Sequence, residues 1–394
     1  MVEIKIIKSK SQIKEFFKFA DCLYANCDLY VPELVGFKKK FFSHKHNPNL
    51  NSNEIVGFLA IQEGKVAGRI LGIANRIEAK ENGVIRFSHM DFINDTEVSF
   101  ALFDAIKNWA KSLKIYKIIG AMGFNDFMSM GCNTSSDYLP TMLNSYNFDY
   151  YIKHLKEYGF VNAKKFNDYV LTLKDGFDED EASFDIYNIL KKNNWKIVEG
   201  SKKFKIEMYR HKINELAYSC PLTPYPVVSE DNSLTGYLKT INKLYDTEDL
   251  NIIINENDDI VGTMLISKNS AIALQVTAGK VLNSKLMYTV KDNNQADYDM
   301  NWLIINKSSN VQVMEVMSLL LAKSFKNKDI NKLHTNLWIN SDSKVKMISK
   351  YFEINKVSER AIFEIDITEE NVIVNRTKSD LAEPKRRGDT SELK

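Results

Sequence analysis

Apolar residues recur with a helical period in the segment that follows Asn94. They fall at i, i+4 and i+7 spacings, at Val98, Leu102, Ala105, Ile106, Trp109 and Leu113. Such spacing places the apolar side chains on one face of a helix that packs against a core. Asp95 or Thr96 stands just before the pattern, where a short polar side chain caps a helix N-terminus. Strand-like runs at 83–93 and 117–124 flank the helix, so the sequence predicts strand, turn, helix and strand in succession.

Two further segments read as β-hairpins because apolar runs flank a short polar turn. Residues 55–76 turn at positions 63–64, and residues 250–267 turn at positions 257–259. After each hairpin come a strand, an amphipathic helix, a strand, a second helix and a closing strand, and the closing strands are expected at 168–174 and 359–367. A helix capped by Ser9 is expected near the N-terminus, and an amphipathic helix at 234–247 precedes the second hairpin. The chain therefore carries two copies of one plan, an internal duplication in element order without strong sequence identity.

The duplication predicts two tandem units. We expect an N-terminal domain over residues 1–175 and a C-terminal domain over residues 184–368, joined by the acidic segment between them. Each unit is expected to be an α/β (α+β) fold in which helices flank a mixed, mostly antiparallel sheet. Residues 369–394 are polar, and we expect this tail to be disordered.

Composition narrows the class of protein. Of the 394 residues, 44% are hydrophobic and 11% aromatic, which is typical of a packed globular protein. The longest apolar runs, such as residues 316–322, are far shorter than the roughly 18 residues that span a bilayer. The first residues lack the apolar core and cleavage site of a signal peptide, so we expect a cytoplasmic protein that binds no membrane.

Fifty-three basic and fifty-one acidic residues give a net charge of +2, which predicts no nucleic-acid partner.

The cysteines and histidines predict no metal site. There are four cysteines, none in a CxxC pair: Cys22, Cys27, Cys132 and Cys220. A reducing cytoplasm would keep them as free thiols. Cys132 could instead be a nucleophile, although nothing near it in the sequence suggests activation. The spacing of His44 and His46 occurs in some zinc sites, but no third ligand is near and a surface loop is the alternative.

Sequence motifs around the first central helix point to a family. Residues 101–104 read ALFD at the start of that helix, and residues 140–151 read PTMLNSYNFDYY. The next helix ends in GF, followed by AK at 163–164, and residues 335–344 in the second half read TNLWINSDSK. These motifs resemble an uncharacterised bacterial family of tandem GNAT-like (N-acetyltransferase-like) proteins. The resemblance spans roughly residues 1–366, with its more specific motifs in the first half.

The resemblance implies two tandem GNAT-like acyl-CoA N-acyltransferase folds and transfer of an acyl group from acyl-CoA to an amine. In that fold a glycine-containing loop at the N-terminus of the central helix holds the pyrophosphate of the cofactor through backbone N–H groups. A tyrosine four residues before the Gly-Phe end of the next helix often protonates the departing thiolate. Here residues 94–97 are Asn-Asp-Thr-Glu, and the tyrosine positions are Leu155 and Met347. We therefore expect the first half to be a scaffold in which helix-capping residues replace the cofactor loop.

The second half is the better candidate for cofactor binding. The segment before its central helix is polar, and its cofactor-binding candidates are Lys307, Ser308, Ser309, Asn310 and Val311. Serine and asparagine there could present amides and hydroxyls to a phosphate, and Lys307 would supply positive charge. Serine and asparagine also cap helices that bind nothing, and this alternative stays open.

Candidates for acceptor binding and proton transfer lie in the first half. The catalytic candidates are His89, Tyr150 and Tyr151, and the substrate-binding candidates are Asn125, Asp126, Tyr146 and Asn147. An imidazole can take a proton from an ammonium group near neutral pH, and tyrosine hydroxyls can orient an amine. The alternative is that the tyrosines pack between loop and helix and that His89 is a partly buried structural residue.

Three functions remain open. The first is an N-acyltransferase that binds acyl-CoA in the second half and an amine of a small molecule or peptide between the halves. The second is a Fem-type aminoacyl transferase, which would be expected to show a basic groove that a net charge of +2 does not indicate. The third is a catalytically inactive protein that binds a partner through the former cleft. A strand splay with open helix amides in the second half would favour the first, and side chains filling the splay would favour the third.

Overall fold

The computed structural model describes residues 1–125, 128–135, 141–142, 144–220, 249–280, 297–307, 310–335 and 342–367. Within these residues, thirteen strands form one sheet in the order β1-β2-β3-β4-β5-β13-β7-β12-β11-β10-β9-β8, with β6 beside β13. The first half contributes β1 Val2–Ile6, α1 Lys10–Leu23, α2 Val35–Lys40, a 3-10 turn Pro48–Asn51, β2 Asn53–Gln62, β3 Lys65–Asn75, α3 Arg76–Asn82, β4 Val84–Phe92, α4 Thr96–Ser112, β5 Lys117–Gly120, β6 Cys132–Asn133, α5 Tyr150–Tyr158 and β7 Val161–Leu173. The second half contributes α6 Glu179–Asn193, β8 Lys196–Ile197, α7 Lys202–Ser219, β9 Leu250–Ile254, β10 Ile260–Lys268, α9 Ala271–Thr277, β11 Asp297–Ile305, α11 Asn310–Lys328, β12 Lys332–His334, α12 Asp342–Ile348 and β13 Phe352–Asp366.

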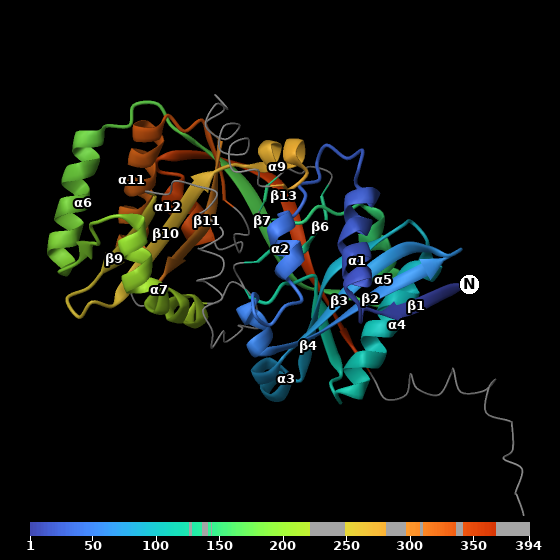
Figure 1. The fold of residues 1–394 in the computed structure, drawn as a ribbon. Coiled ribbons are helices and arrows are strands. Elements are labelled where there is room, and N and C mark those ends of the chain that lie inside the picture. The colour runs from blue at the N-terminus through green and yellow to red at the C-terminus, as the bar shows by residue number, and fades with distance from the viewer. Residues whose placement is uncertain are drawn as a thin grey trace, which may run out of the picture.

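Helices cover both faces of the sheet in each half (Figure 1). In the N-terminal half, α4 and α5 pack on one face around Phe87, and α1 packs on the other around Leu71. In the C-terminal half, α6 and α11 share a core with Met300, whereas α7 and α9 share a second core with Trp302 on the opposite face. The predicted fold class, helices flanking a mixed and mostly antiparallel sheet, is confirmed.

Local signals in the sequence are borne out where they fall on described residues. Ser9 caps α1 in a capping box with Gln12. The Glu63-Gly64 turn joins β2 to β3, and Gly159 ends α5 in a left-handed conformation with a φ of 110°. A residue with a Cβ is strained in that conformation, which is why glycine ends the helix there.

The duplication is visible at one matched pair of glycines. Gly68 of β3 lies opposite Phe92, the last residue of β4, and Gly262 of β10 lies opposite Ile305, the last residue of β11. A Cβ at Gly68 would come within 2.8 Å of Leu102 in α4, and one at Gly262 within 2.5 Å of Val313 in α11. In both halves a glycine therefore lets the central helix lie directly on the sheet.

The closing strands differ from expectation. The sequence predicted a strand near the end of each half, over residues 168–174 and 359–367, whereas β7 has 13 residues and β13 has 15. The two strands pair antiparallel from Phe352↔Leu173 to Glu364↔Val161. At its far end β13 pairs with β5 of the first half, and β7 pairs with β12 of the second. The halves thus exchange strands, and Figure 1 shows β7 and β13 running side by side through the centre of the molecule.

Several other elements were missed or lie outside the described residues. Helices α7 and α9 were not predicted, and the acidic linker is shorter than expected because Asp178 caps α6 and residues 179–181 form its first turn. The helix predicted at 234–247 and the tail at 369–394 lie outside the described residues. The domain limits 1–175 and 184–368 stay a prediction.

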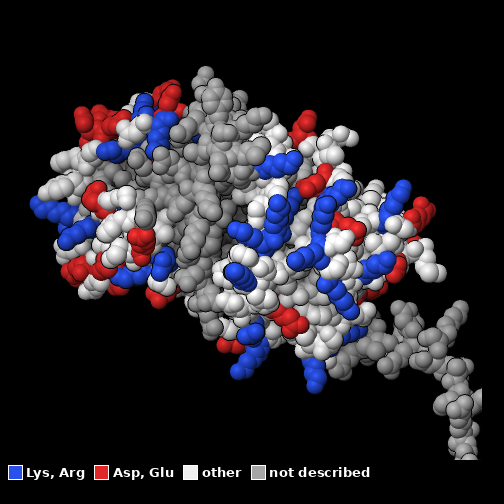
Figure 2. Space-filling view, viewed as in Figure 1, with Lys and Arg blue, Asp and Glu red and all other residues white. Residues whose placement is uncertain are grey.

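Neither positive nor negative charge predominates on the face of the molecule shown in Figure 2. Figure 2 shows basic and acidic side chains interspersed on both halves, with several lysines over α1 and α2 of the N-terminal half. In the described part of the chain, none of the helices is both long and apolar enough to cross a membrane.

Candidate active site

Two adjacent strands pair in parallel in each half, next to the start of a central helix. In the N-terminal half, β4 and β5 pair in parallel from Val84↔Lys117 to Phe87↔Gly120, after which β4 continues to Phe92. In the C-terminal half, β11 and β12 pair in parallel up to Asp299↔His334, after which β11 continues to Ile305. Beyond the last of these pairs the N-terminal strands part in a V-shaped splay. We call the corresponding region of the C-terminal half, beyond Asp299↔His334, the C-terminal splay, and the last strand pair the vertex of each splay; residues 336–341, which follow β12, lie outside the described residues.

Protein side chains fill the splay of the N-terminal half. Tyr151 is fully buried, and its ring stacks on Phe92 with centroids 4.3 Å apart. Its hydroxyl accepts a hydrogen bond from the Phe92 amide at 3.0 Å, and the Tyr150 hydroxyl donates to the Phe92 carbonyl at 2.6 Å. The backbone groups at the end of β4 are thus satisfied by α5, and both tyrosine hydroxyls have structural partners.

The N-terminus of α4, beside this splay, is capped by side chains of the protein. Asp95 caps α4 by accepting a hydrogen bond from the Glu97 amide at 2.8 Å, which confirms the predicted cap. Gln62 donates to the other carboxylate oxygen of Asp95 at 2.8 Å. Glu97 adds a second carboxylate in the first turn. Two acids at this position repel a pyrophosphate, since phosphate groups and carboxylates carry the same charge.

His89 lies in a buried ionic network on the opposite face of the N-terminal sheet. It sits at a bulge in β4 with a φ of 44°, and its Nδ1 lies 2.8 Å from the Ser88 hydroxyl. Its Nε2 lies 3.3 Å from Glu33. Burial alone would raise the pKa of Glu33, but His89, Arg69 and Lys38 lower it to about 2. Both ring nitrogens of His89 therefore have partners within the fold.

The remaining first-half candidates pack in separate places. Asn125 is buried, and its amide lies 3.4 Å from Asn49. Asn147 accepts a hydrogen bond from the Asn133 amide at 2.7 Å and holds β6 in position. Tyr146 packs edge-on against Tyr24, and burial raises its pKa to about 12. Asp126 lies outside the described residues.

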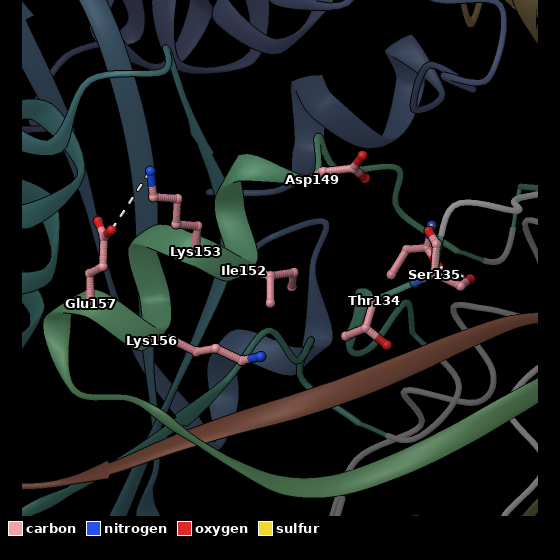
Figure 3. Close-up of a pocket in the computed structure, with 8 residues that line it drawn as sticks. Thr134, Ser135, Asp149, Ile152, Lys153, Lys156 and Glu157 are labelled. Atoms are coloured by element: carbon pink, nitrogen blue, oxygen red, sulfur yellow. Dashed lines mark hydrogen bonds and ion pairs between the residues drawn. The ribbon is translucent and has the colours of Figure 1, made fainter.

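An open groove of about 530 Å³ lies elsewhere in the N-terminal half, between α5 and residues 133–135 (Figure 3). Ile152 and Lys156 extend from α5 toward residues 134–135. Lys153 and Glu157 also line the groove and form an ion pair with each other. The lining carries both signs of charge, which gives the groove no selectivity for an anion.

The vertex of the C-terminal splay holds a buried carboxylate next to an imidazole. Asp299 is 2% exposed, and its Oδ1 lies 3.6 Å from Nδ1 of His334. Asn269 donates to Oδ1 at 3.0 Å, and Thr141 of the N-terminal half donates to Oδ2 at 3.1 Å. Burial raises the pKa of Asp299 to about 6, and the charge of His334 and the two hydrogen bonds oppose a further rise. The carboxyl group of Asp299 can therefore gain or lose a proton near neutral pH.

The Asp299–His334 pair was not predicted from the sequence. Asp299 lies between Tyr298 and Met300 in a strand that ends in the apolar run 302–305, and His334 follows the apolar Leu333 in the neighbouring strand. A charged residue inside a buried strand is costly unless it is paired or functional, so Asp299 was the available signal. Its partner His334 could not be identified from the sequence, because the two residues are 35 positions apart and only the register of the sheet places them side by side.

Of the cofactor candidates, Lys307 follows the end of β11, and Asn310 and Val311 begin α11. Lys307 is exposed, and Val311 in the first turn of the helix is 67% exposed. The first turn of α11 carries no acidic residue, in contrast to Glu97 in α4. Asn310 begins the helix, while Ser308 and Ser309 lie outside the described residues. An exposed helix N-terminus beside a lysine fits the charge of a pyrophosphate.

Among the described residues, no group of three or more His, Cys, Asp or Glu side chains is placed to hold a metal ion. Cys132 is buried, and burial raises the pKa of its thiol to about 11, which disfavours the thiolate that a nucleophile requires.

Comparison with known proteins agrees with this architecture. No family model matches the chain. Protein YghO of Escherichia coli (strain K12) is 25% identical over 160 residues, which are 40% of this chain and 41% of YghO. The alignment therefore leaves more than half of that relative unmatched.

Solved structures are similar over nearly the whole chain. A tandem GNAT protein from the clavulanic acid biosynthesis pathway matches with a TM-score of 0.51 and 7% identity, covering 93% of this chain and 98% of that one. A GCN5-related glucosamine N-acetyltransferase region of a fungal multi-domain GH3 β-N-acetylglucosaminidase matches with a TM-score of 0.53 and 9% identity, covering 93% and 38%. A probable N-acyltransferase from Enterococcus faecalis V583 matches with a TM-score of 0.50 and 8% identity, covering 93% and 73%.

At these identities the similarity shows the fold and not the activity. The chain has the tandem GNAT-like fold of N-acetyltransferases, as its motifs predicted. The reaction has to be argued from the residues of this chain.

Proposed function

We propose that this protein is an N-acyltransferase in which the C-terminal half binds acyl-CoA and performs the transfer. The acceptor would be an amine of a small molecule or peptide that enters between the halves. The observation that carries the proposal is the Asp299–His334 pair at the vertex of the C-terminal splay. The corresponding splay of the N-terminal half is filled by Tyr151.

The start of α11 would hold the cofactor. The backbone amides of its first turn, together with Lys307 and Asn310, would bind the pyrophosphate, with Ser308 and Ser309 completing the segment. Acyl-CoA, when bound, supplies the acyl group and leaves as the free thiol. The helix start and the Asp299–His334 pair belong to one splay, so a cofactor bound along it would bring the acyl group toward the pair.

His334 would accept the proton that the acceptor amine releases. Its Nδ1 faces Asp299, so a proton on Nδ1 leaves Nε2 with a free lone pair. The negative charge of Asp299 favours this orientation and stabilises the imidazolium that forms. An amine attacks a carbonyl only as the neutral base, and for this reason proton acceptance beside the acyl carbon accelerates transfer.

Equivalent positions in the two central helices allow a matched test of which half binds the cofactor. Val311 is the second residue of α11, as Glu97 is of α4, and both side chains are about two-thirds exposed. We expect Val311→Glu to weaken CoA binding about tenfold, because it places a carboxylate against the pyrophosphate. The same change favours the helix dipole, so it should not lower the melting temperature.

Isothermal titration with CoA and acetyl-CoA measures this effect, with Glu97→Lys as the control in the N-terminal half. The control should leave the affinity unchanged. Tighter binding in Glu97→Lys, which replaces a repelling carboxylate with a cation, together with unchanged binding in Val311→Glu would move the cofactor to the other half. No binding by the wild type up to millimolar CoA would remove the proposal and favour a non-catalytic binding protein.

A further inference from the structure

A short segment of the N-terminal half is inserted into the C-terminal half beside the Asp299–His334 pair. Thr141 is 4% exposed, and its neighbour Met142 packs into the core between α7 and α9 of the other half. The Ser270 hydroxyl lies 3.9 Å from the Met142 sulfur. Residues 141–142 thus lie between β6 and α5 of the N-terminal half in sequence, but they pack against the C-terminal half beside Asp299.

Thr141 and the two C-terminal residues contact different oxygens of the Asp299 carboxylate. Asn269 and His334 both lie against Oδ1 of Asp299, whereas Thr141 donates to Oδ2. Two donors on opposite oxygens fix the plane of a carboxylate, so rotation about the Cβ–Cγ bond would break one of the hydrogen bonds. The plane of Asp299 in turn sets the direction in which it can hold the His334 ring.

We propose that Thr141 is a positioning residue for the transfer reaction, supplied by the N-terminal half to the active site of the C-terminal half. This inference rests on the proposed function. It gives the N-terminal half, whose own splay is filled, a specific role in the reaction of its neighbour. The Thr141 hydroxyl touches neither acyl-CoA nor acceptor in this account, and it acts through Asp299 on His334.

Loss of the Thr141 hydroxyl would change the balance of charged and polar groups that sets the protonation of Asp299. They are His334 from β12, Asp297 from β11 itself, Asn269 from the segment after β10, and Thr141. The Thr141 hydrogen bond stabilises the ionised carboxylate, and the nearby charge of Asp297 opposes it. Removing the hydroxyl therefore favours the protonated form of Asp299, and the pH at which the pair becomes competent should rise.

The test compares Thr141→Val, which keeps the shape of the side chain, with Thr141→Ser, which keeps the hydroxyl. We expect Thr141→Val to move the acidic limb of the kcat/KM–pH profile upward by about one pH unit while the KM for acyl-CoA stays the same. Thr141→Ser should restore the wild-type limb. Met142→Leu, a volume-conserving change in the same segment, should leave the limb in place.

NMR titration of the Asp299 carboxyl carbon adds a readout independent of turnover, and Thr141→Val should raise its midpoint. An active wild type whose limb and carboxyl titration are unchanged in Thr141→Val would overturn this inference and leave the proposed function intact. Failure of Thr141→Ser to restore the limb would also overturn it. A wild type that neither binds CoA nor transfers acyl groups would remove the proposed function, and this inference with it.

Discussion

Cutting the chain after residue 176 should give two fragments that fold only in each other's presence. The fragment 1–176 contains β5 and β7 but lacks β13, which pairs with both. It also lacks Ala361, Ile362 and Phe363, which are fully buried in the N-terminal cores. The second fragment lacks β7, which separates β12 from β13 in the sheet. Each fragment would therefore expose unpaired strand edges and an incomplete core.

Circular dichroism and size-exclusion chromatography of the separate and co-expressed fragments measure this outcome. We expect each fragment alone to melt without a cooperative transition, and the pair to co-elute and melt as one unit. A cooperative melt of fragment 1–176 by itself would show that the exchanged strands are dispensable for the N-terminal half.

A point variant in the intact chain tests the same dependence of the N-terminal half on β13. Phe363→Ala, only 31 residues from the C-terminus, should destabilise the N-terminal half by about 3–5 kcal/mol, because it empties a fully buried position. Phe184→Ala, at a side chain that is 66% exposed on α6, should change stability by less than about 0.5 kcal/mol.

Asp299→Asn should lower activity and raise stability in the same protein. We expect kcat/KM to fall about 10²- to 10⁴-fold, because a neutral amide does not hold His334 as a proton acceptor. The stability effect follows from the pKa of Asp299, which folding raises from 3.8 to about 6. A raised carboxyl pKa means that the folded state prefers the protonated form. The resulting cost is absent below pH 3.8, accumulates as the pH rises from 3.8 to about 6, and is complete above that pH.

Asparagine removes that cost, so the variant should be more stable than the wild type at pH 8 by up to about 3 kcal/mol. The difference should disappear below about pH 4, where the wild-type carboxyl is neutral. Urea unfolding at several pH values measures it, with Asp366→Asn at an exposed position of β13 as the control. An Asp299→Asn protein that keeps full activity would exclude the pair from proton transfer, and one that is less stable at pH 8 would contradict the raised pKa.

Much of the fold was predictable because its local signals are strong. The capping residues Ser9 and Asp95, the polar hairpin turns and the 3.6-residue period of α4 each reflect contacts within a few residues of the chain. The predicted erosion of the first cofactor loop followed from charge, since Asp95 and Glu97 occupy the helix start.

What escaped prediction depends on contacts between distant segments. Strand exchange places residue 352 against residue 173, and no local pattern distinguishes a strand that closes its own half from one that closes the other. The Asp299–His334–Thr141 arrangement joins three segments whose outermost members are 193 positions apart. The filling of the N-terminal splay by Tyr151 likewise required knowing that α5 lies across the end of β4.

The most direct test of the central claim is hydrogen–deuterium exchange of the intact protein with and without saturating acetyl-CoA. We expect slower exchange of the amides in the first turn of α11, which begins at Asn310, and no change in the first turn of α4, which begins at Thr96. Protection at the start of α4, or at neither helix, would contradict a cofactor site in the C-terminal half.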